Sequence, residues 1–273
     1  MLKTEMRNPK TMNLSFMNTD EMLQAMQEEN LYAVEAVKKE LPQIEKAVDA
    51  VAKSFENGGR LFYIGCGTSG RLGVVDAAEC PPTFGVDSDM VVGIIAGGLP
   101  RMASAGEHEE DNGEQGRKDL QAQKPKKGDV VVGLSVAGGA RYVLEALAYA
   151  KEIGCITASI TANADSPLAQ ASDIPICPDT GSEVLTGSTR LKAGTAQKLV
   201  LNMISTCAMA KQGYVYENLM INLKPSNEKL RGRVIRIVRE LTGKDEETAV
   251  MFLDKNDWEI RKTVEAMKAQ ETT

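Results

Sequence analysis

The chain has 273 residues, is 42% hydrophobic and 26% charged, and carries a net charge of −6 at neutral pH. This length allows one large or two small domains with a sizeable buried core. The acidic balance argues against a general nucleic-acid-binding protein, and no run reaches the roughly 18 apolar residues of a membrane span. We therefore expect a globular protein that binds neither nucleic acid nor membrane.

The first ten residues lack the apolar core of a signal peptide, so we expect a cytoplasmic protein. The five cysteines are an odd number and form no C-x-x-C pair. This spacing indicates neither a disulfide framework nor a zinc site, and we expect reduced, mostly buried thiols. The cysteines are Cys66, Cys80, Cys155, Cys177 and Cys207.

Residues 1–57 are predicted to form an arm followed by two helices. The arm lacks periodicity up to Asn18, and we interpret it as a candidate contact with a partner subunit. Asn18 and Glu21 have the spacing of a capping box, and an amphipathic pattern follows them to Leu41. A second helical pattern runs from Ile44 to Phe55 and ends at glycines 58 and 59.

Residues 58–224 alternate short apolar runs with helical or glycine-rich segments. Buried runs in this order predict an α/β domain with a parallel sheet of about five strands, covered by helices on both faces. A crossover helix is expected from Ala140 to Ile153, and Ser166 with Pro167 is expected to begin another. The predicted strands are Leu61–Ile64, Met90–Ala96, Val130–Ser135, Cys155–Ile160 and Ile174–Cys177.

The last predicted elements are helical. A long helix is expected from Ser188 to Gly213 and a shorter one from Tyr216 to Met220. Residues 225–273 change in composition, and we expect them to form a small helical subdomain. Its predicted helices are Glu228–Leu241, Asp245–Leu253 and Asp257–Met267.

The turn after the first predicted strand is the strongest functional signal. Gly65 and Gly67 precede the hydroxyls of Thr68 and Ser69 at the start of a helix, where backbone N–H groups and the helix dipole favour an anion. The plain alternative is that these hydroxyls only cap the helix. Glu79 is expected at the end of this helix, which we predict to be about two turns long because Pro81 and Pro82 stop it.

A dinucleotide site is the alternative use of this turn, because Gly65, Gly67 and Gly70 satisfy G-x-G-x-x-G. That fingerprint expects an acidic residue at the end of the second strand, whereas this strand ends in Ala96 and two glycines. The predicted short helix also disfavours NAD, so a phosphate on a smaller ligand is preferred. A second glycine-rich loop, from Ser135 to Arg141, is expected to meet the first above the strand ends.

Five motifs stand out along the chain: TEMRNP from Thr4, LFYIGCGTSGRLGVVDAAECPPTFG from Leu61, GIIAGG from Gly93, GEHEED from Gly106 and EVLTGSTRLKAGTAQKLVLNMIST from Glu183. Together they resemble the bacterial N-acetylmuramic acid 6-phosphate etherases of the sugar-isomerase (SIS) superfamily. The resemblance covers most of the chain, and it implies a flavodoxin-like three-layer fold and a homodimer with its site near the subunit interface. It also implies a cytoplasmic role in cell-wall recycling. The vertebrate glucokinase regulatory protein is a distant relative that binds sugar phosphates without turnover.

The resemblance implies cleavage of the D-lactyl ether of N-acetylmuramic acid 6-phosphate without a metal or an organic cofactor. Glu79 and Glu110 match the two proposed acid/base groups of the family. Without the resemblance, Glu79 would be interpreted as a surface glutamate. The acidic run would be interpreted as a solvated face, and its members are Glu107, Glu109, Glu110 and Asp111. The residues implied to bind the sugar phosphate are Gly65, Gly67, Thr68, Ser69, Ser135, Gly138, Glu183, Ser188 and Lys192.

The second loop departs from the family. These etherases usually carry Ser-Gly-Arg-Thr-Pro where this chain has residues Ala137 to Arg141, so hydroxyl donors are missing. A lost donor to a charged group costs about 1.5 to 3 kcal/mol, unless Ser135 or Arg141 compensates. The C-terminal tail is also shorter than usual. The alternatives are a sugar-phosphate-binding regulator without turnover and an aldose–ketose isomerase.

Overall fold

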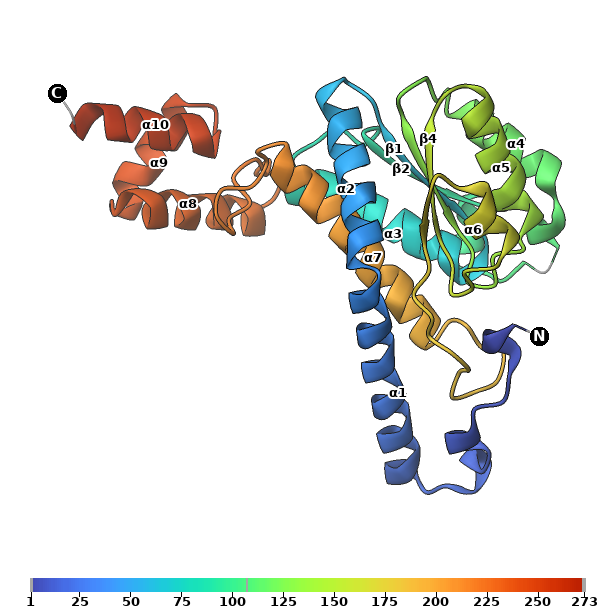
Figure 1. Ribbon diagram of the computed structural model, residues 1–273. Helices are drawn as coiled ribbons and strands as arrows, with labels where there is room; N and C mark the ends of the chain where they lie inside the picture. Colours follow the sequence, from blue (N-terminus) through green and yellow to red (C-terminus); the bar gives the residue numbers. More distant parts are fainter. Residues whose placement is uncertain (1, 107, 272–273) are drawn as a thin grey trace. The chain divides into compact units, whose positions relative to one another are not determined.

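The computed structural model describes residues 2–106 and 108–271, and its centre is a parallel sheet in the order β2-β1-β3-β4-β5 (Figure 1). This is the flavodoxin-like strand order, and it confirms the predicted five-stranded sheet. Each predicted strand is found to within about one residue at either end. The strands are β1 (Leu61–Gly65), β2 (Val91–Ile95), β3 (Val130–Leu134), β4 (Ile156–Ile160) and β5 (Ile174–Ile176).

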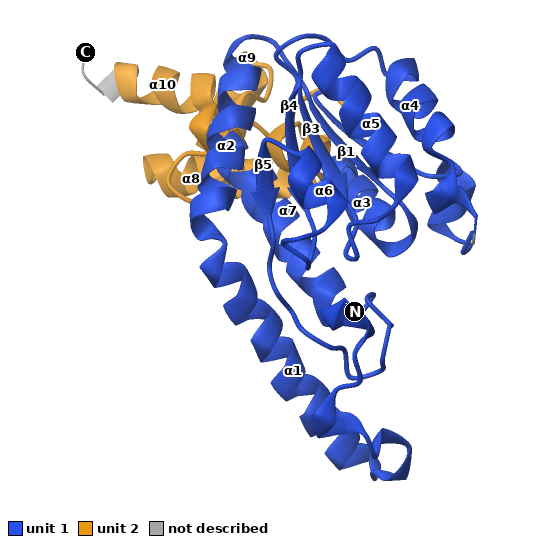
Figure 2. Ribbon diagram, turned by 45° about the vertical axis from the view of Figure 1, so that its right-hand side comes forward, with its two compact units in different colours: residues 1–78, 89–208 blue, residues 79–88, 209–273 orange. Residues whose placement is uncertain are grey.

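Helices cover both faces of the sheet, which makes the three layers expected of the fold (Figures 1 and 2). One face carries α4 (Gly113–Ala122), α5 (Arg141–Glu152) and α6 (Pro167–Ala171). The other face carries α2 (Leu41–Glu56), α3 (Gly67–Phe84) and α7 (Lys192–Lys211). Both predicted starts, at Ala140 and at Ser166, agree with α5 and α6 to within a residue.

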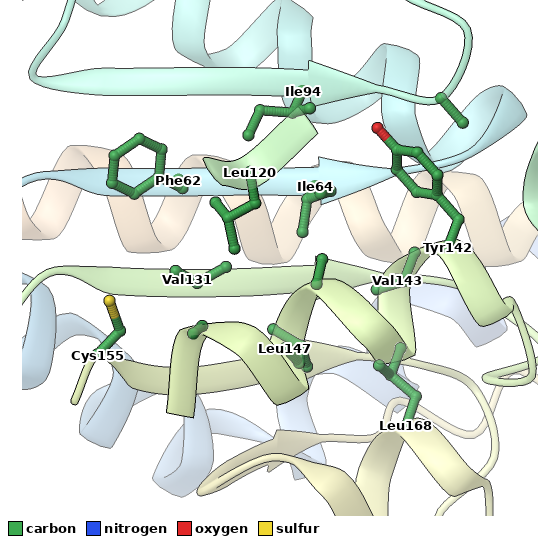
Figure 3. Packing of buried hydrophobic residues seen from close by; sticks show 13 residues of the cluster. Phe62, Ile64, Ile94, Leu120, Val131, Tyr142, Val143, Leu147, Cys155 and Leu168 are labelled. Carbon is green, nitrogen blue, oxygen red and sulfur yellow. The ribbon is translucent and has the colours of Figure 1, made fainter. Parts of the chain in front are cut away.

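The core under α4, α5 and α6 follows from the alternation of side chains along the strands. Phe62 and Ile64 of β1 point to the same face and pack with Leu120, Tyr142 and Leu147 from the helices (Figure 3). All five side chains are fully buried, and each contributes about 1.5 to 3 kcal/mol of transfer free energy. This packing fixes the ends of β1 and β3, where the site lies.

The N-terminal arm packs against a distant segment of its own chain. It contains short 3-10 helices at Lys3–Glu5, Pro9–Thr11 and Leu14–Phe16. The Thr11 hydroxyl donates to the Val184 carbonyl at 2.9 Å, and Lys3 pairs with Asp179. The predicted capping box is confirmed, because Asn18 and Glu21 bond reciprocally at the start of α1 (Thr19–Lys39).

The expectation that Pro81 and Pro82 end the helix after β1 is wrong. Both prolines lie inside α3, which continues to Phe84 and ends at Gly85, where φ is +66°. The buried side chains of Cys80 and Phe84 stabilise this extension against the loss of backbone hydrogen bonds at proline. A short helix therefore no longer argues against an NAD site. The missing acidic residue after β2 still disfavours NAD binding.

Two boundaries further along the chain also differ. The helix predicted from Tyr216 to Met220 is wrong, because Tyr216 and Leu219 exchange both backbone hydrogen bonds across a tight turn with Glu217 at φ +52°. The long helix begins at Lys192 rather than Ser188. Its first N–H groups are capped by a carboxylate from an earlier loop residue, Glu183.

The chain forms two compact units, residues 1–78 with 89–208 and residues 79–88 with 209–273 (Figure 2). The second unit contains the helices expected in the tail, and Leu230, Val238, Phe252 and Leu253 are part of its core. They are α8 (Glu228–Thr242), α9 (Glu246–Lys255) and α10 (Ile260–Glu271). Over residues 2–106 and 108–271, no helix has the length and hydrophobicity needed to cross a membrane.

Candidate active site

The first glycine-rich turn brings the start of α3 directly onto the end of β1. A Cβ atom on Gly65 would lie 2.9 Å from the Gly70 nitrogen, and one on Gly70 would lie 2.5 Å from the Gly65 carbonyl oxygen. Only glycine allows this approach. As a result, the first turn of α3, where helix geometry leaves N–H groups without intrahelical acceptors, adjoins the carboxyl end of β1, as predicted for an anion site.

A cavity of about 250 Å³ lies at this point. The strand order reverses between β1 and β3, and open α/β sheets bind ligands at such a switch point. Five predicted site residues meet here, namely Gly67, Thr68, Ser69, Ser135 and Glu110. The other lining residues are Cys66, Arg71, Ala96, Arg101, Gly106, Glu109, Leu134, Val136, Ala137, Ala140 and Thr189.

The two hydroxyls at the start of α3 differ in their partners. Ser69 is buried, and its hydroxyl donates to Gln197 Oε1 at 2.8 Å. Gln197 Nε2 in turn donates to the Ile160 carbonyl at 3.2 Å, so Ser69 ties α3 to α7 and β4. Thr68 has no hydrogen-bond partner for its side chain among the described residues, and its hydroxyl is available to a ligand.

The second loop presents mainly methyl groups to the cavity. The Gly138 N–H donates to Ser135 Oγ at 3.1 Å, and a Cβ on Gly138 would lie 2.3 Å from Ser166 Oγ. Gly138 is therefore turned inward and, within the described chain, does not line the cavity. Val136, Ala137 and Ala140 line it instead, and the resemblance leads one to expect hydroxyl side chains at positions 137 and 140.

The side chains of two further predicted site residues, Glu183 and Lys192, bind other groups of the protein. Glu183 accepts the backbone N–H groups of Lys192 and Ala193 at 3.1 and 3.0 Å, and burial raises the pKa of its carboxyl despite these bonds. Lys192 Nζ is buried in an ion pair with Glu29 of α1. Among the described residues neither side chain lines the cavity.

The loop that carries Ser188 reaches the cavity through its neighbour. Ser188 donates its backbone N–H to the Leu185 carbonyl at 3.0 Å, while Thr189 lines the cavity. Sequence reasoning considered Thr189 in this motif but did not select it. Arg71 and Arg101 were also missed as lining residues, although Arg71 stands in the GTSGRLG motif and was open to selection.

The acidic loop supplies two carboxylates with different environments. Glu109 pairs with Arg101 at 2.6 Å, and its pKa is lowered by its own backbone N–H and by that guanidinium. Glu110 faces the cavity, and no hydrogen bond or ion pair to it is found in the described part of the chain. Glu107 lies outside the described residues.

The charge of this loop reaches Cys66, which lines the same cavity. Burial, followed by the negative charges of Glu110, Glu109 and Asp111, raises the pKa of the Cys66 thiol to about 12. The thiol is neutral at physiological pH, which makes Cys66 a poor nucleophile. Carboxylates are therefore the groups in this cavity that are suited to proton transfer.

Glu79 is a predicted catalytic residue that is not found among the described lining of this cavity. It is exposed near the end of α3, belongs to the second compact unit, and is absent from the described residues that line the cavity. Eleven positions separate it from Thr68 along the helix. At about 1.5 Å per residue this corresponds to about 16 Å.

Comparisons with known proteins identify the family. The description "Glucokinase regulatory protein N-terminal SIS domain" matches residues 43–151, and "SIS domain" matches residues 113–206. The N-acetylmuramic acid 6-phosphate etherase of Salmonella typhi is 49% identical over 96% of this chain and 89% of its own. That of Cronobacter sakazakii is 50% identical over the same shares. The chain belongs to the N-acetylmuramic acid 6-phosphate etherase family.

Solved structures place this etherase-family chain in the same fold as distant phosphosugar enzymes. The phosphoheptose isomerase of Francisella tularensis is 16% identical, with a TM-score of 0.53 over 70% of this chain and 98% of that one. The phosphoheptose isomerase of Neisseria gonorrhoeae is 18% identical, with a TM-score of 0.53 over 71% and 100%. These likenesses confirm the predicted SIS fold.

Proposed function

We propose that this protein is a carbon–oxygen lyase that cleaves N-acetylmuramic acid 6-phosphate to N-acetylglucosamine 6-phosphate and D-lactate. The observation that carries the proposal is one cavity lined both by the helix start at Thr68 and Ser69 and by Glu110, whose carboxylate has no partner among the described residues. The etherase relatives support the substrate. The role belongs to cytoplasmic cell-wall recycling, and the net charge of −6 fits a protein without nucleic-acid or anionic-membrane partners.

The phosphate belongs at the start of α3. The N–H groups of the first turn and the helix dipole favour an anion there, and the Thr68 hydroxyl adds a donor. Thr189 lines the same cavity and is a second hydroxyl of the proposed site. Ser135 is the remaining hydroxyl of the second loop at this cavity, so phosphate binding relies mainly on the first loop.

The chemistry needs a general base and a general acid, and no cofactor. In the open-chain sugar, the aldehyde acidifies the proton on C2, and a carboxylate removes it. The C3–O bond breaks with its electron pair leaving on the lactate oxygen, which an acid protonates. Water then adds to C3 while a proton returns to C2. Glu110 is one of the two proposed acid/base groups.

The second group, Glu79, is proposed to act from a second copy of the chain. Among the described residues, Glu79 does not line the cavity that Glu110 lines. A homodimer supplies the missing carboxylate from the partner. Exposed apolar side chains on the arm and α1 support such an interface. They include Met12, Phe16, Leu23, Leu31 and Val34, with Phe16 88% exposed.

The test is release of D-lactate from N-acetylmuramic acid 6-phosphate by the purified protein. We expect Glu110→Gln to lower kcat by about 10²-fold or more, because general acid–base catalysis contributes 10² to 10⁴. Asp111→Asn is the matched control, since Asp111 is an exposed neighbour in the same loop. A folded parent that binds N-acetylglucosamine 6-phosphate but releases no lactate would instead favour a regulator, in keeping with the apolar second loop.

A further inference from the structure

The loop that carries Glu110 is held by two arginines, Arg71 of α3 and Arg101 of the loop itself. It leaves β2 through two glycines with positive φ and contains the 3-10 helices Leu99–Met102 and Glu109–Asp111. The guanidinium groups of Arg71 and Arg101 donate hydrogen bonds to backbone carbonyls in the described part of this loop. Both arginines also line the cavity.

Arg71 joins the anion end of α3 to this loop. It lies one turn into α3, where Nε donates to the Met102 carbonyl at 3.1 Å and Nη2 to the Ser104 carbonyl at 2.7 Å. The planar guanidinium suits this two-pronged contact, whereas a lysine ammonium offers a single point of charge. The half-buried position of Arg71 places the contact at the edge of the cavity.

Arg101 fixes the following turn and occupies the other carboxylate. Its Nη1 donates to the Ala105 carbonyl at 3.1 Å, while its Nη2 lies 2.6 Å from Glu109 Oε1. The Glu109 carboxylate covers Gly106, where an added Cβ would lie 2.2 Å from Glu109 Oε2. Glu109 is held in this way, whereas Glu110 lines the same cavity and has no pairing partner among the described residues.

We propose that Arg71 is a positioning residue, which holds residues 102–104 so that the loop presents Glu110 to a substrate whose phosphate sits at the start of α3. The inference rests on the proposed function, which gives Glu110 its acid/base role. It assigns Arg71 to the loop rather than to the phosphate. Loss of Arg71 should therefore impair turnover while leaving the affinity for a sugar phosphate in place.

The experiment compares Arg71→Met and Arg71→Lys with Arg236→Met, which removes an exposed arginine of α8. Amide hydrogen exchange of residues 99–106 is measured in each full-length protein, with kcat and the Kd for N-acetylglucosamine 6-phosphate. We expect Arg71→Met to exchange about tenfold faster in this loop, since exchange reports local opening. We expect kcat to fall by about 10²-fold, the effect of a misplacement of about 1 Å, and Kd to change by less than about threefold.

Arg71→Lys should behave like Arg71→Met, because an ammonium lacks the rigid planar fork with which the guanidinium contacts both carbonyls. Full activity in Arg71→Lys, or unchanged exchange in Arg71→Met, would overturn the proposal. A Kd weakened by about tenfold or more with kcat unchanged would make Arg71 a phosphate ligand instead. If the parent releases no lactate, the proposed function fails, while the exchange data still decide whether Arg71 holds the loop.

Discussion

At the scale of single residues, Thr68 and Ser69 are adjacent hydroxyls with separable roles. Thr68→Val should weaken binding of N-acetylglucosamine 6-phosphate by about one to two decades, because a hydrogen bond to a charged group contributes about 1.5 to 3 kcal/mol. Ser69→Ala should instead lower the stability by about 1 kcal/mol, since it removes the hydroxyl that donates to the buried Gln197 Oε1. Titration calorimetry and thermal unfolding check both. Equal loss of affinity in the two variants would contradict this assignment.

The buried pair of Glu29 and Lys192 gives a second prediction. Glu29→Gln should destabilise the protein by about 3 kcal/mol, because it leaves the buried ammonium of Lys192 without its carboxylate. The exposed neighbour Glu28 provides the control variant Glu28→Gln. Urea unfolding measures the difference, and an equal stability of both variants would contradict a structural role for the pair.

The same pair makes a pH-dependent contribution. Burial opposes ionisation of Glu29, but hydrogen bonds and charge from Lys192 and Lys10 outweigh it, and the pKa falls below its usual value of 4.5. The unfolded chain therefore binds this proton more readily. The stabilisation is present above pH 4.5 and is lost as the pH falls through the lower pKa of the folded state. Urea midpoints from pH 7 to 3 should drop less steeply in Glu29→Gln than in the parent.

Sequence reasoning could not distinguish a buried charged residue from a ligand-binding one. Glu183 and Lys192 stand in the family motif beside Thr189, yet their partners are the start of α7 and Glu29, which lies 163 residues from Lys192. Local spacing carries no information on such distant partners. The local signal of a helix start led to Gly67 and Thr68, which line the cavity, whereas only the family motif singled out Glu110 from its acidic run.

At the scale of elements, α3 shows that tertiary packing can outweigh the rule that proline ends a helix. This helix continues past Pro81 and Pro82 and ends at Gly85. An added Cβ at Gly85 would lie 1.8 Å from the Asn222 carbonyl oxygen, whereas Gly243 has the same positive φ and open space. Gly85→Ala should therefore destabilise the protein by about 2 kcal/mol more than Gly243→Ala, which suffers the backbone strain alone. Thermal unfolding measures the stability lost in each variant. Equal losses of stability would contradict the close contact between Gly85 and the Asn222 carbonyl.

The strands were predictable because each is a short buried run bounded by turn residues. Helix α4 was not predicted, since its sequence GEQGRKDLQA is strongly polar and only Gly116 and Leu120 are buried. The end of α3 was mispredicted because the proline rule is local, while burial of Cys80 and Phe84 depends on the folded chain. These differences arise where packing decides between local alternatives.

At the scale of the whole molecule, the proposed dimer depends on the apolar surface of the arm and α1. Phe16→Asp combined with Leu23→Asp should shift the protein from dimer to monomer, because charges replace two highly exposed apolar side chains at the proposed interface. Met251→Asp, on an exposed apolar residue of the second unit, is the control. Light scattering measures the mass, and an unchanged dimer in the double variant would place the interface elsewhere.

The most direct test of a site built from two copies is D-lactate release by mixed dimers of Glu79→Gln and Glu110→Gln chains. Each variant alone should be inactive. A mixed dimer pairs the intact Glu110 of one chain with the intact Glu79 of the other at one of its two sites, so activity should return on mixing. Mixed dimers that stay inactive beside an active parent would contradict the shared site, and an inactive parent would contradict the lyase itself.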